Sequence, residues 1–174
     1  IDDSQGEIAL CILSAINVGQ LNNLEDLENL CELAVRALEE IIEYQDYPVK
    51  AAEVSTKSRR SLGIGYIGLA HYLAKQGFKY SEKGAWDSVD RLTEAFQFYL
   101  LKASNKLAQE RGACEGFKQT KYADGLLPID HYKKEVDEIV PHKQRMAWEA
   151  LRKDITKHGL RHSTLSAQMP SESS

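Results

Sequence analysis

The side chains best suited to covalent chemistry in this 174-residue sequence are three cysteine thiols, Cys11, Cys31 and Cys114. They lie far apart and form no C-x-x-C pair, so their spacing predicts neither a zinc site nor a disulfide framework. A lone cysteine in an apolar run is usually a small buried apolar side chain. For Cys11, in the apolar run Glu7–Ala15, a structural role and a redox role both stay open at this point.

Hydroxyl side chains gather at the C-terminal end, where Pro170 is followed by Ser171, Glu172, Ser173 and Ser174. Hydroxyls and backbone N–H groups at a strand-to-helix turn can bind a phosphate, and the helix dipole strengthens that binding. A serine-rich end can equally be a solvated tail. The segment is therefore a candidate phosphate site whose chemistry depends on the elements around it.

Two further patterns resemble ligand sites but lack the surroundings that such sites need. Gly63, Gly65 and Gly68 match G-x-G-x-x-G, yet no buried strand precedes them and no acidic residue follows at the end of a second strand. We interpret these glycines as positions where a turn and a helix pack closely, not as a dinucleotide site. The adjacent Arg59 and Arg60 are candidates for anion binding, although such arginines are more often solvated or paired with carboxylates.

The histidines do not form a set of metal ligands in the sequence. His158 and His162 are four residues apart, but Gly159 is expected to end the helix between them. No H-E-x-x-H motif is present. We therefore expect neither a metal ion nor a cofactor to be bound by this chain.

The composition is that of an ordinary soluble globular domain, with 43% hydrophobic residues, 28% charged residues and a net charge of -4. This mild acidity argues against a nucleic-acid-binding face, which needs clustered basic residues. No apolar run reaches the roughly 18 residues of a membrane span, and the first residues lack the features of a signal peptide. We expect a cytoplasmic protein that does not contact a membrane, and the missing initial Met suggests a chain that begins inside a longer protein.

The elements that would position these residues are helices with a strand near each end of the chain. The nearly continuous apolar run Glu7–Ala15 is typical of a strand buried on both faces in a parallel sheet, and Arg161–Gln168 is predicted to form a second strand. Arg59 and Arg60 fall in a predicted connection. Apolar residues at three- and four-residue spacing predict five helices. The first begins at the capping-box-like pair Asn22 and Glu25 and reaches Ile42, the second spans Leu69–Lys75, and the third runs from about Trp86 to Leu107 with Gly112 as its end. The fourth is a short helix capped by Asp130 that stops before Pro141, and the fifth runs from Lys143 to His158 with Gly159 as its end. Two strands make no complete sheet, so this α/β fold is expected to be part of a larger one.

Four stretches, in this order, resemble the large, catalytic subunit of class I (aerobic) ribonucleotide reductases, and most closely the bacterial and bacteriophage members. They are Gly6–Gly19 (GEIALCILSAINVG), the motifs YQDYPVKAAE and RRSLGIG within Tyr44–Gly65, Leu126–Lys134 (LLPIDHYKK) and His158–Ser174 (HGLRHSTLSAQMPSESS). The family fold is a ten-stranded α/β barrel of two antiparallel five-stranded halves, with a finger loop inside it. The resemblance implies that residues 1–174 are a helix-rich partial segment of this barrel.

The resemblance also implies roles for particular residues. Cys11 matches the strand cysteine that, with a partner thiol on an N-terminal strand outside this chain, supplies reducing equivalents to the ribose. Ser171, Glu172, Ser173 and Ser174 match the loop that binds the substrate diphosphate, with Glu172 contributing mainly its backbone N–H because a carboxylate repels phosphate.

The radical cysteine of the family lies in an Asn-x-Cys-x-Glu loop, which Asn29–Glu32 (NLCE) matches only superficially. Its glutamate falls one residue too early, and Cys31 lies on the apolar stripe of a predicted helix. We interpret Cys31 as a core residue, treat Cys114 as structural, and expect the true loop upstream of Ile1.

The resemblance implies part of an enzyme, ribonucleoside-diphosphate reductase, an oxidoreductase that makes deoxyribonucleotides for DNA synthesis by radical chemistry. The expected partners are a ribonucleoside diphosphate, thioredoxin or glutaredoxin, the small (beta) subunit that holds the metal-radical cofactor, and a second full-length large subunit in a homodimer. The radical cysteine, the partner thiol and the allosteric ATP-binding and other nucleotide-binding sites would lie outside this chain. The fragment is therefore expected to be inactive alone.

Three alternatives remain at this level. The chain could be a naturally split piece that assembles with its flanking pieces. The long amphipathic helices also permit a non-catalytic helical interaction module, in which Cys11 would be inert and the isolated chain would fold stably. A dehydrogenase would depend on the glycine pattern alone.

Overall fold

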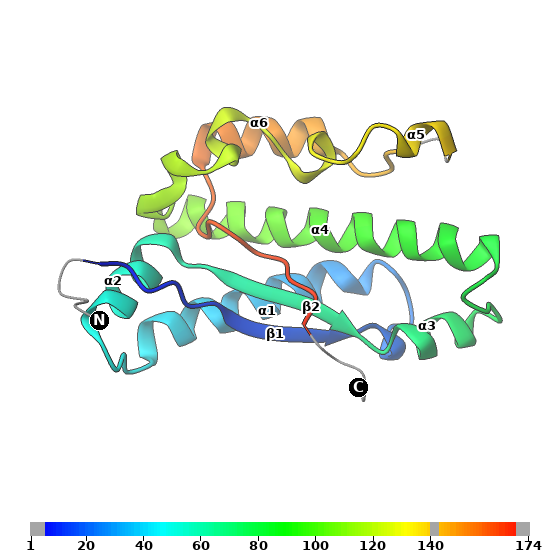
Figure 1. Ribbon diagram of the computed structural model, residues 1–174, viewed down its shortest axis with the longest axis horizontal. Helices are drawn as coiled ribbons and strands as arrows, with labels where there is room; N and C mark the ends of the chain where they lie inside the picture. Colours follow the sequence, from blue (N-terminus) through cyan, green and yellow to red (C-terminus); the bar gives the residue numbers. More distant parts are fainter. Residues whose placement is uncertain (1–5, 140–142, 170–174) are drawn as a thin grey trace.

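The structure, a computed structural model, describes residues 6–139 and 143–169, and its sheet consists of two parallel strands (Figure 1). Strand β1 is Ile12–Asn17 and strand β2 is Leu62–Ile67, with Leu13 opposite Gly63 and Ala15 opposite Gly65. The α/β class and the parallel pairing are confirmed, and the sheet is not a closed barrel. However, β2 was not predicted as a strand, because glycines have low strand propensity and weaken the apolar signal of the segment.

The first predicted strand is shifted along the chain and is not buried on both faces. It begins at Ile12 and not at Glu7, and Ile16 is buried while Leu13 is 59% exposed. Side chains alternate between the two faces of a strand. In the described residues, helices cover only the face of Ile16, so the continuous apolar run marks a second face that this part of the chain leaves open.

The predicted C-terminal strand is wrong as a regular element. Its backbone does follow β2, since Leu62 N–H donates to the Thr164 carbonyl at 3.1 Å and Ile64 N–H to the Leu165 carbonyl at 2.8 Å. Only one isolated parallel bridge, between Ile64 and Ser166, joins the two in the described residues. We call residues 164–169 the third segment, because it lies beside β2 in the position of a third strand.

The helices follow the predicted pattern with changes at their ends. The structure has α1 (Asp26–Tyr44), α2 (Lys50–Arg59), α3 (Leu69–Lys75), α4 (Lys83–Arg111), α5 (Val136–Ile139) and α6 (Trp148–His158), with short 3₁₀ helices at Val18–Gln20, Glu115–Gln119, Lys121–Asp124 and Pro128–Asp130. The predicted ends at Gly112 and Gly159 and the helix over Leu69–Lys75 are confirmed.

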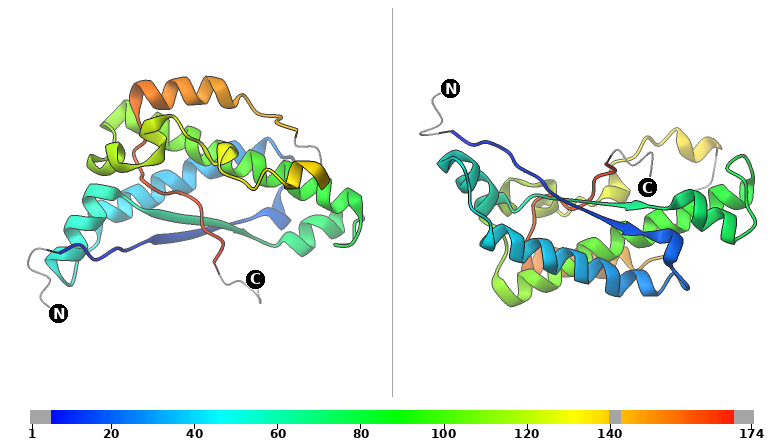
Figure 2. Two further views of the ribbon diagram at one scale, coloured as in Figure 1. Left: turned by 45° about the horizontal axis from the view of Figure 1, so that its top comes forward. Right: turned by 90° about the horizontal axis from the view of Figure 1, so that it is seen from below.

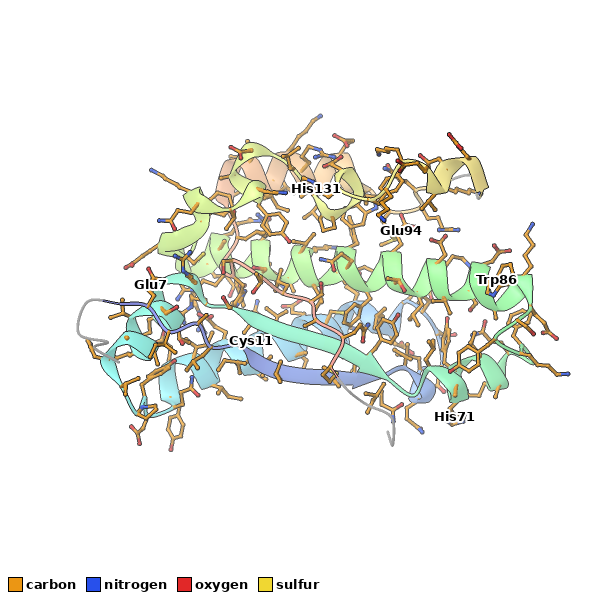
Figure 3. All side chains as sticks on the ribbon, in the orientation of Figure 1. Glu7, Cys11, His71, Trp86, Glu94 and His131 are labelled. Carbon is orange, nitrogen blue, oxygen red and sulfur yellow. The ribbon has the colours of Figure 1, made fainter. Side chains whose placement is uncertain are left out.

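Three predicted helix boundaries were wrong for local reasons. Helix α1 has no capping side chain at Glu25, and instead the Asp26 carboxylate accepts the Asn23 N–H at 3.2 Å. Asp130 belongs to a 3₁₀ turn, where it accepts the Leu127 N–H at 2.7 Å, and the short helix α5 is separate. Helix α6 begins at Trp148. The helix starts late because the Glu94 carboxylate on α4 (Figure 3) accepts hydrogen bonds from residues just before and at its start. The donors are the backbone N–H groups of Arg145 and Met146 and the Nε1–H of Trp148.

Helix α2 replaces the predicted connection around Arg59. Its buried side carries only small residues, Ala51, Ala52, Ser55 and Thr56, so no apolar stripe announced the helix. It ends at Arg59, and the cap residue Arg60 adopts a left-handed conformation with φ 51°. This is the cap position that glycine usually occupies, and the buried contacts of the Arg60 side chain account for an arginine there.

Helices α1 and α4 pack against each other and cover one face of the strands, and α6 packs on the far side of α4 (Figures 1 and 2). Two edge-to-face ring pairs join the layers: Tyr66 of β2 on Phe96 of α4 at 5.3 Å, and Phe98 of α4 on Trp148 of α6 at 5.2 Å. Such pairs contribute about 0.5–1.5 kcal/mol beyond the burial of their area. The predicted apolar stripe of α4 holds except at Trp86, which is 59% exposed.

Candidate functional site

Cys11 projects from the chain immediately before β1, on the sheet face that the helices leave open (Figure 3). Its side chain is exposed, and it is a free thiol. Neighbouring atoms partly desolvate the thiol and raise its pKa. Cys11 is therefore a protonated, accessible thiol at neutral pH, which argues against the purely structural interpretation of an apolar core residue.

The backbone of β2 lies directly against this thiol. A Cβ placed on Gly63 would lie only 2.7 Å from the Sγ of Cys11 and 3.3 Å from the Cβ of Ala167 in the third segment. The thiol and the third segment thus approach the same point above Gly63. Gly63 and Gly65 lie inside a strand, so the dinucleotide pattern does not form a phosphate-binding turn here. The expectation that they lie where a turn packs against a helix was therefore wrong for these two glycines.

The candidate phosphate loop, Ser171, Glu172, Ser173 and Ser174, lies outside the described residues, and its assignment stays a prediction. The last described residue before it, Met169, lies against β2: its Sδ would be 2.9 Å from a Cβ on Gly65. The chain therefore leaves the described region from the same face of β2 on which Cys11 lies.

The structure also contains a buried charge cluster that the sequence analysis missed, centred on Glu39 of α1. The fully buried Glu39 carboxylate accepts from Arg60 Nε at 2.9 Å, Arg161 Nε at 2.8 Å and His162 Nε2 at 3.0 Å. Arg60 also pairs with Glu43. A signal was present in the sequence, because Glu39 shares the buried face of α1 with Val35 and Ile42 at three- and four-residue spacing.

The cluster fixes the protonation states of its members. Burial by itself would raise the pKa of Glu39, but hydrogen bonds from His162, Arg60 and Arg161 outweigh it and lower the pKa. Burial lowers the pKa of His162 more than Glu39 raises it, so the imidazole is neutral. The neutral ring donates from Nε2 to Glu39 and accepts at Nδ1 from the Ser104 hydroxyl, 2.9 Å away.

Ser104, His162 and Glu39 thus have the order of a hydroxyl, a base and an orienting carboxylate, as in hydrolases. All three residues are fully buried, so no substrate can reach the Ser104 hydroxyl. The Ser104 oxygen moreover accepts the His162 backbone N–H at 3.2 Å. We therefore interpret the arrangement as a structural connection between α1, α4 and the start of residues 161–169, which we call the C-terminal segment and which includes the third segment.

The remaining candidates are structural in the described residues. Cys31 and Cys114 are buried, and burial raises the pKa of Cys31 to about 12, so the interpretation of Cys31 as a core residue is confirmed. Arg59 and Arg60 are paired with carboxylates, Arg59 with Glu7 at 2.7 Å. No group of three potential metal-ligating side chains occurs within residues 6–139 and 143–169.

Three surface hollows of about 440, 490 and 510 Å³ are lined without Cys11. The first lies between Arg59, Lys121 and His131, the second between β1 and α1, and the third beside Trp86. The exposed thiol thus lies on an open sheet face and not in an enclosed pocket. A site that excludes water around Cys11 would need walls from outside the described residues.

Comparisons with known proteins agree on one family. The family model described as "Ribonucleotide reductase, barrel domain" matches residues 1–174. The chain is 57% identical over 174 residues to the ribonucleoside-diphosphate reductase subunit alpha of Haemophilus influenzae, covering all of this chain and 23% of the relative. It is 56% identical over 133 residues to the ribonucleoside-diphosphate reductase 1 subunit alpha of Escherichia coli K12, covering 76% of this chain and 18% of the relative. The subunit alpha of Enterobacteria phage T4 is 42% identical over 176 residues, covering all of this chain and 23% of the relative.

The matched part of the chain therefore spans about a fifth to a quarter of the length of these curated relatives, 23% for the first. Among the described residues, no helix has the length and apolar character needed to cross a membrane. The expected match to bacterial and bacteriophage proteins is confirmed.

Proposed function

The chain belongs to the ribonucleotide reductase barrel-domain family, and we propose that in the full-length subunit it forms one part of the active site that reduces ribonucleoside diphosphates to 2′-deoxyribonucleoside diphosphates. The observation that carries the proposal is the position of Cys11. Its accessible thiol and the third segment, which leads to Ser171–Ser174, approach the same glycine of β2. The described chain thus brings the thiol close to the segment that precedes the proposed diphosphate loop, as a nucleotide that contacts both would require.

The chemistry requires a pair of thiols. The ribose loses its 2′ hydroxyl as water and gains a hydrogen at C2′. Two thiols supply the two electrons and two protons, and the new S–S bond between them stores the oxidation. Cys11 would be one of these thiols. Its partner would come from outside the chain, since Cys31 and Cys114 are buried.

Restoring the enzyme then requires an external dithiol, thioredoxin or glutaredoxin, which reduces the disulfide by thiol–disulfide exchange. The radical that starts the reaction would come from the metal-radical cofactor of the separate small subunit, and two full-length large subunits would form the homodimer. Binding of ATP and other allosteric nucleotides would belong to parts of the subunit outside this chain. A cytoplasmic location fits these partners, because the reducing cytosol keeps thiols available.

Cys11→Ser in the full-length reductase tests the redox role. We expect the variant to lose multiple turnover with thioredoxin, because serine cannot form the disulfide. Cys114→Ser is the control, since that thiol is buried away from the open face and should leave turnover in place. Normal steady-state turnover by Cys11→Ser would refute the assignment and favour a non-catalytic helical module.

The double variant Ser173→Ala, Ser174→Ala tests the phosphate loop separately. Loss of two hydroxyl donors should raise the KM for nucleoside diphosphates, by about tenfold if the lost hydrogen bonds to charged oxygens contribute about 1.4 kcal/mol together. The corresponding nucleosides, which carry no phosphate, should bind equally to both proteins. An unchanged KM for diphosphates would contradict the role of the loop.

A further inference from the structure

The first of the three hollows, beside the start of β2, differs from the other two in its charge. Among the described residues, its lining includes Arg59, Lys121 and His131 and no aspartate or glutamate. The second hollow is lined by Asp26 and the third by Asp90, and the described lining of neither includes a basic side chain. The whole chain has a net charge of -4. Basic groups thus gather in this hollow against the overall charge, which favours an anion as its ligand.

Two of the basic side chains keep donors that can bind such an anion. Arg59 Nε donates to Glu7 at 2.7 Å, and Arg59 Nη1 donates to Gln119 at 3.2 Å. A guanidinium group carries five N–H donors, so the hydrogens on Nη2 stay available to a ligand. The Lys121 ammonium is exposed and pairs with no carboxylate within residues 6–139 and 143–169.

Hydroxyl groups add further donors to the lining. The Oγ atoms of Ser61 and Ser163 lie 3.2 Å apart, so one hydroxyl donates to the other and the second proton remains for a ligand. The Ser163 N–H donates to the Arg59 carbonyl at 2.9 Å, which holds this serine next to the arginine. The Tyr122 hydroxyl has no hydrogen-bond partner in the part of the chain that the structure describes, and burial raises its pKa, so it is a donor at neutral pH.

The rest of the lining is apolar. It includes Leu127, which is fully buried, Leu126, which is 38% exposed, and Pro128. The hollow has a volume of about 440 Å³, within the range of about 300–1,000 Å³ that is typical of small-molecule sites. A bare anion would leave these apolar side chains uncovered. The ligand that fits the whole lining therefore combines an anionic group with an apolar ring.

We propose that this hollow binds a phosphate monoester joined to an apolar ring, which is the chemistry of a nucleoside monophosphate. The phosphate contacts Arg59, Lys121 and Ser163, because its three terminal oxygens can accept from several charged and neutral donors at once. The ring lies against Tyr122 and Leu126. This assignment does not depend on the role of Cys11.

The hollow is separate from the proposed diphosphate loop. Thr164, which lines the hollow, lies at the start of the third segment, and Met169 lies at its end. Five residues of extended chain between them span about 16 Å. A ligand in the hollow and a substrate diphosphate beyond Met169 therefore occupy opposite ends of this segment.

Lys121 gives a direct readout of binding, because an exposed amine reacts with an acylating reagent unless a ligand covers it. The full-length subunit is labelled with and without adenosine monophosphate, and the acylation of each lysine is measured by mass spectrometry. At ten times its Kd, the monophosphate should slow acylation of Lys121 by about tenfold. Lys118, which is exposed but does not line the hollow, should react at an unchanged rate. Adenosine and inorganic phosphate, which each carry half of the required chemistry, should need concentrations at least about tenfold higher.

Ser163→Ala and Ser166→Ala form a matched pair of variants within the C-terminal segment. Ser163 lines the hollow, whereas the Ser166 hydroxyl donates to Gln97 at 2.6 Å and lies outside the lining. Loss of a hydrogen bond to a charged phosphate oxygen should raise the concentration of adenosine monophosphate that half-protects Lys121 by about tenfold in Ser163→Ala. Ser166→Ala should leave it unchanged. Normal labelling of Lys118 shows that both variants keep their fold.

Three outcomes would overturn the inference. If Lys121 resists acylation without any ligand, other parts of the subunit cover the hollow. If adenosine or inorganic phosphate protects Lys121 at the same concentrations as the monophosphate, the ligand does not combine the two groups. If Ser163→Ala protects like Ser166→Ala, the protection arises from another site. None of these outcomes changes the turnover of Cys11→Ser, so this inference and the proposed function fail separately.

Discussion

Glu39→Gln is the substitution that most directly tests the buried charge cluster and its hold on the C-terminal segment. The change keeps the size of the side chain but removes its charge. One carboxylate oxygen becomes an NH₂ group, which would face the N–H donors of Arg60, Arg161 or His162 and donate where an acceptor is needed. Two buried or nearly buried guanidinium groups then lose their main counter-charge.

The size of the effect follows from burial. The Glu39 side chain is fully buried and that of Arg60 is 5% exposed, so solvent cannot replace the lost interaction. Removing one partner of a buried ion pair costs about 3–5 kcal/mol. The lower figure applies here because Arg60 keeps Glu43 as a second partner. About 3 kcal/mol corresponds to roughly a 100-fold rise in the population of the locally open form.

Native-state hydrogen exchange of the full-length subunit measures this opening. The reporting amides belong to Arg161, Ser163 and Ala167, which donate to the carbonyls of Ser104, Arg59 and Ile64. Glu40→Gln is the matched control: Glu40 is the next residue of α1, but its side chain is 60% exposed and pairs with Arg111 at the surface. Such pairs contribute about 0–1 kcal/mol. If Glu39→Gln accelerates exchange at these amides no more than Glu40→Gln does, the cluster does not hold the segment.

Two further predictions concern pH and packing. Because the pKa of His162 in the folded protein is lowered, the open form binds the proton more readily, so protection of the same amides should fall as the pH drops below about 6.5. His162→Gln should remove that part of the pH dependence, and a retained slope would point to another group. Leu101→Ala, at a fully buried position of α4, should destabilise the subunit to urea by about 2–5 kcal/mol. Lys102→Ala, at its exposed neighbour, should cost less than about 1 kcal/mol.

The fold was predictable where hydrophobic periodicity alone determines it. The apolar stripes located α1 and α4, and glycines marked the ends of α4 and α6. Prediction failed where packing uses small residues or side-chain hydrogen bonds. Helix α2 buries alanine and hydroxyl side chains, so it carries no apolar stripe. The start of α6 is set by Glu94, which lies more than 50 residues earlier in the chain and leaves no local signal.

The residues of the candidate site likewise divide into those that the sequence identified and those that it did not. Cys11 was found through a family resemblance and not through its surroundings, because an exposed and a buried thiol look alike in an apolar run. Gly63 and Gly65 were noticed, but the pattern was tested against a phosphate turn when the relevant partners were Cys11 and the third segment. Glu39 was overlooked, although a charged residue on the buried face of a helix requires buried partners.

Together these features show how one irregular segment is held at two places by different interactions. At its start, Arg161 and His162 bind the Glu39 carboxylate, so the attachment depends on charge and on the exclusion of water. Near its end, Ala167 and Met169 lie against Gly65, so the attachment depends on the absence of a side chain. Only one bridge joins the segment to β2 between these places. Backbone hydrogen bonds from Leu62 and Ile64 to the carbonyls of Thr164 and Leu165, and from Ala167 to the Ile64 carbonyl, act together with these two attachments. Glu39→Gln and Gly65→Ala should then weaken different ends of the segment, with faster exchange at the Arg161 amide in the first variant and at the Ala167 amide in the second.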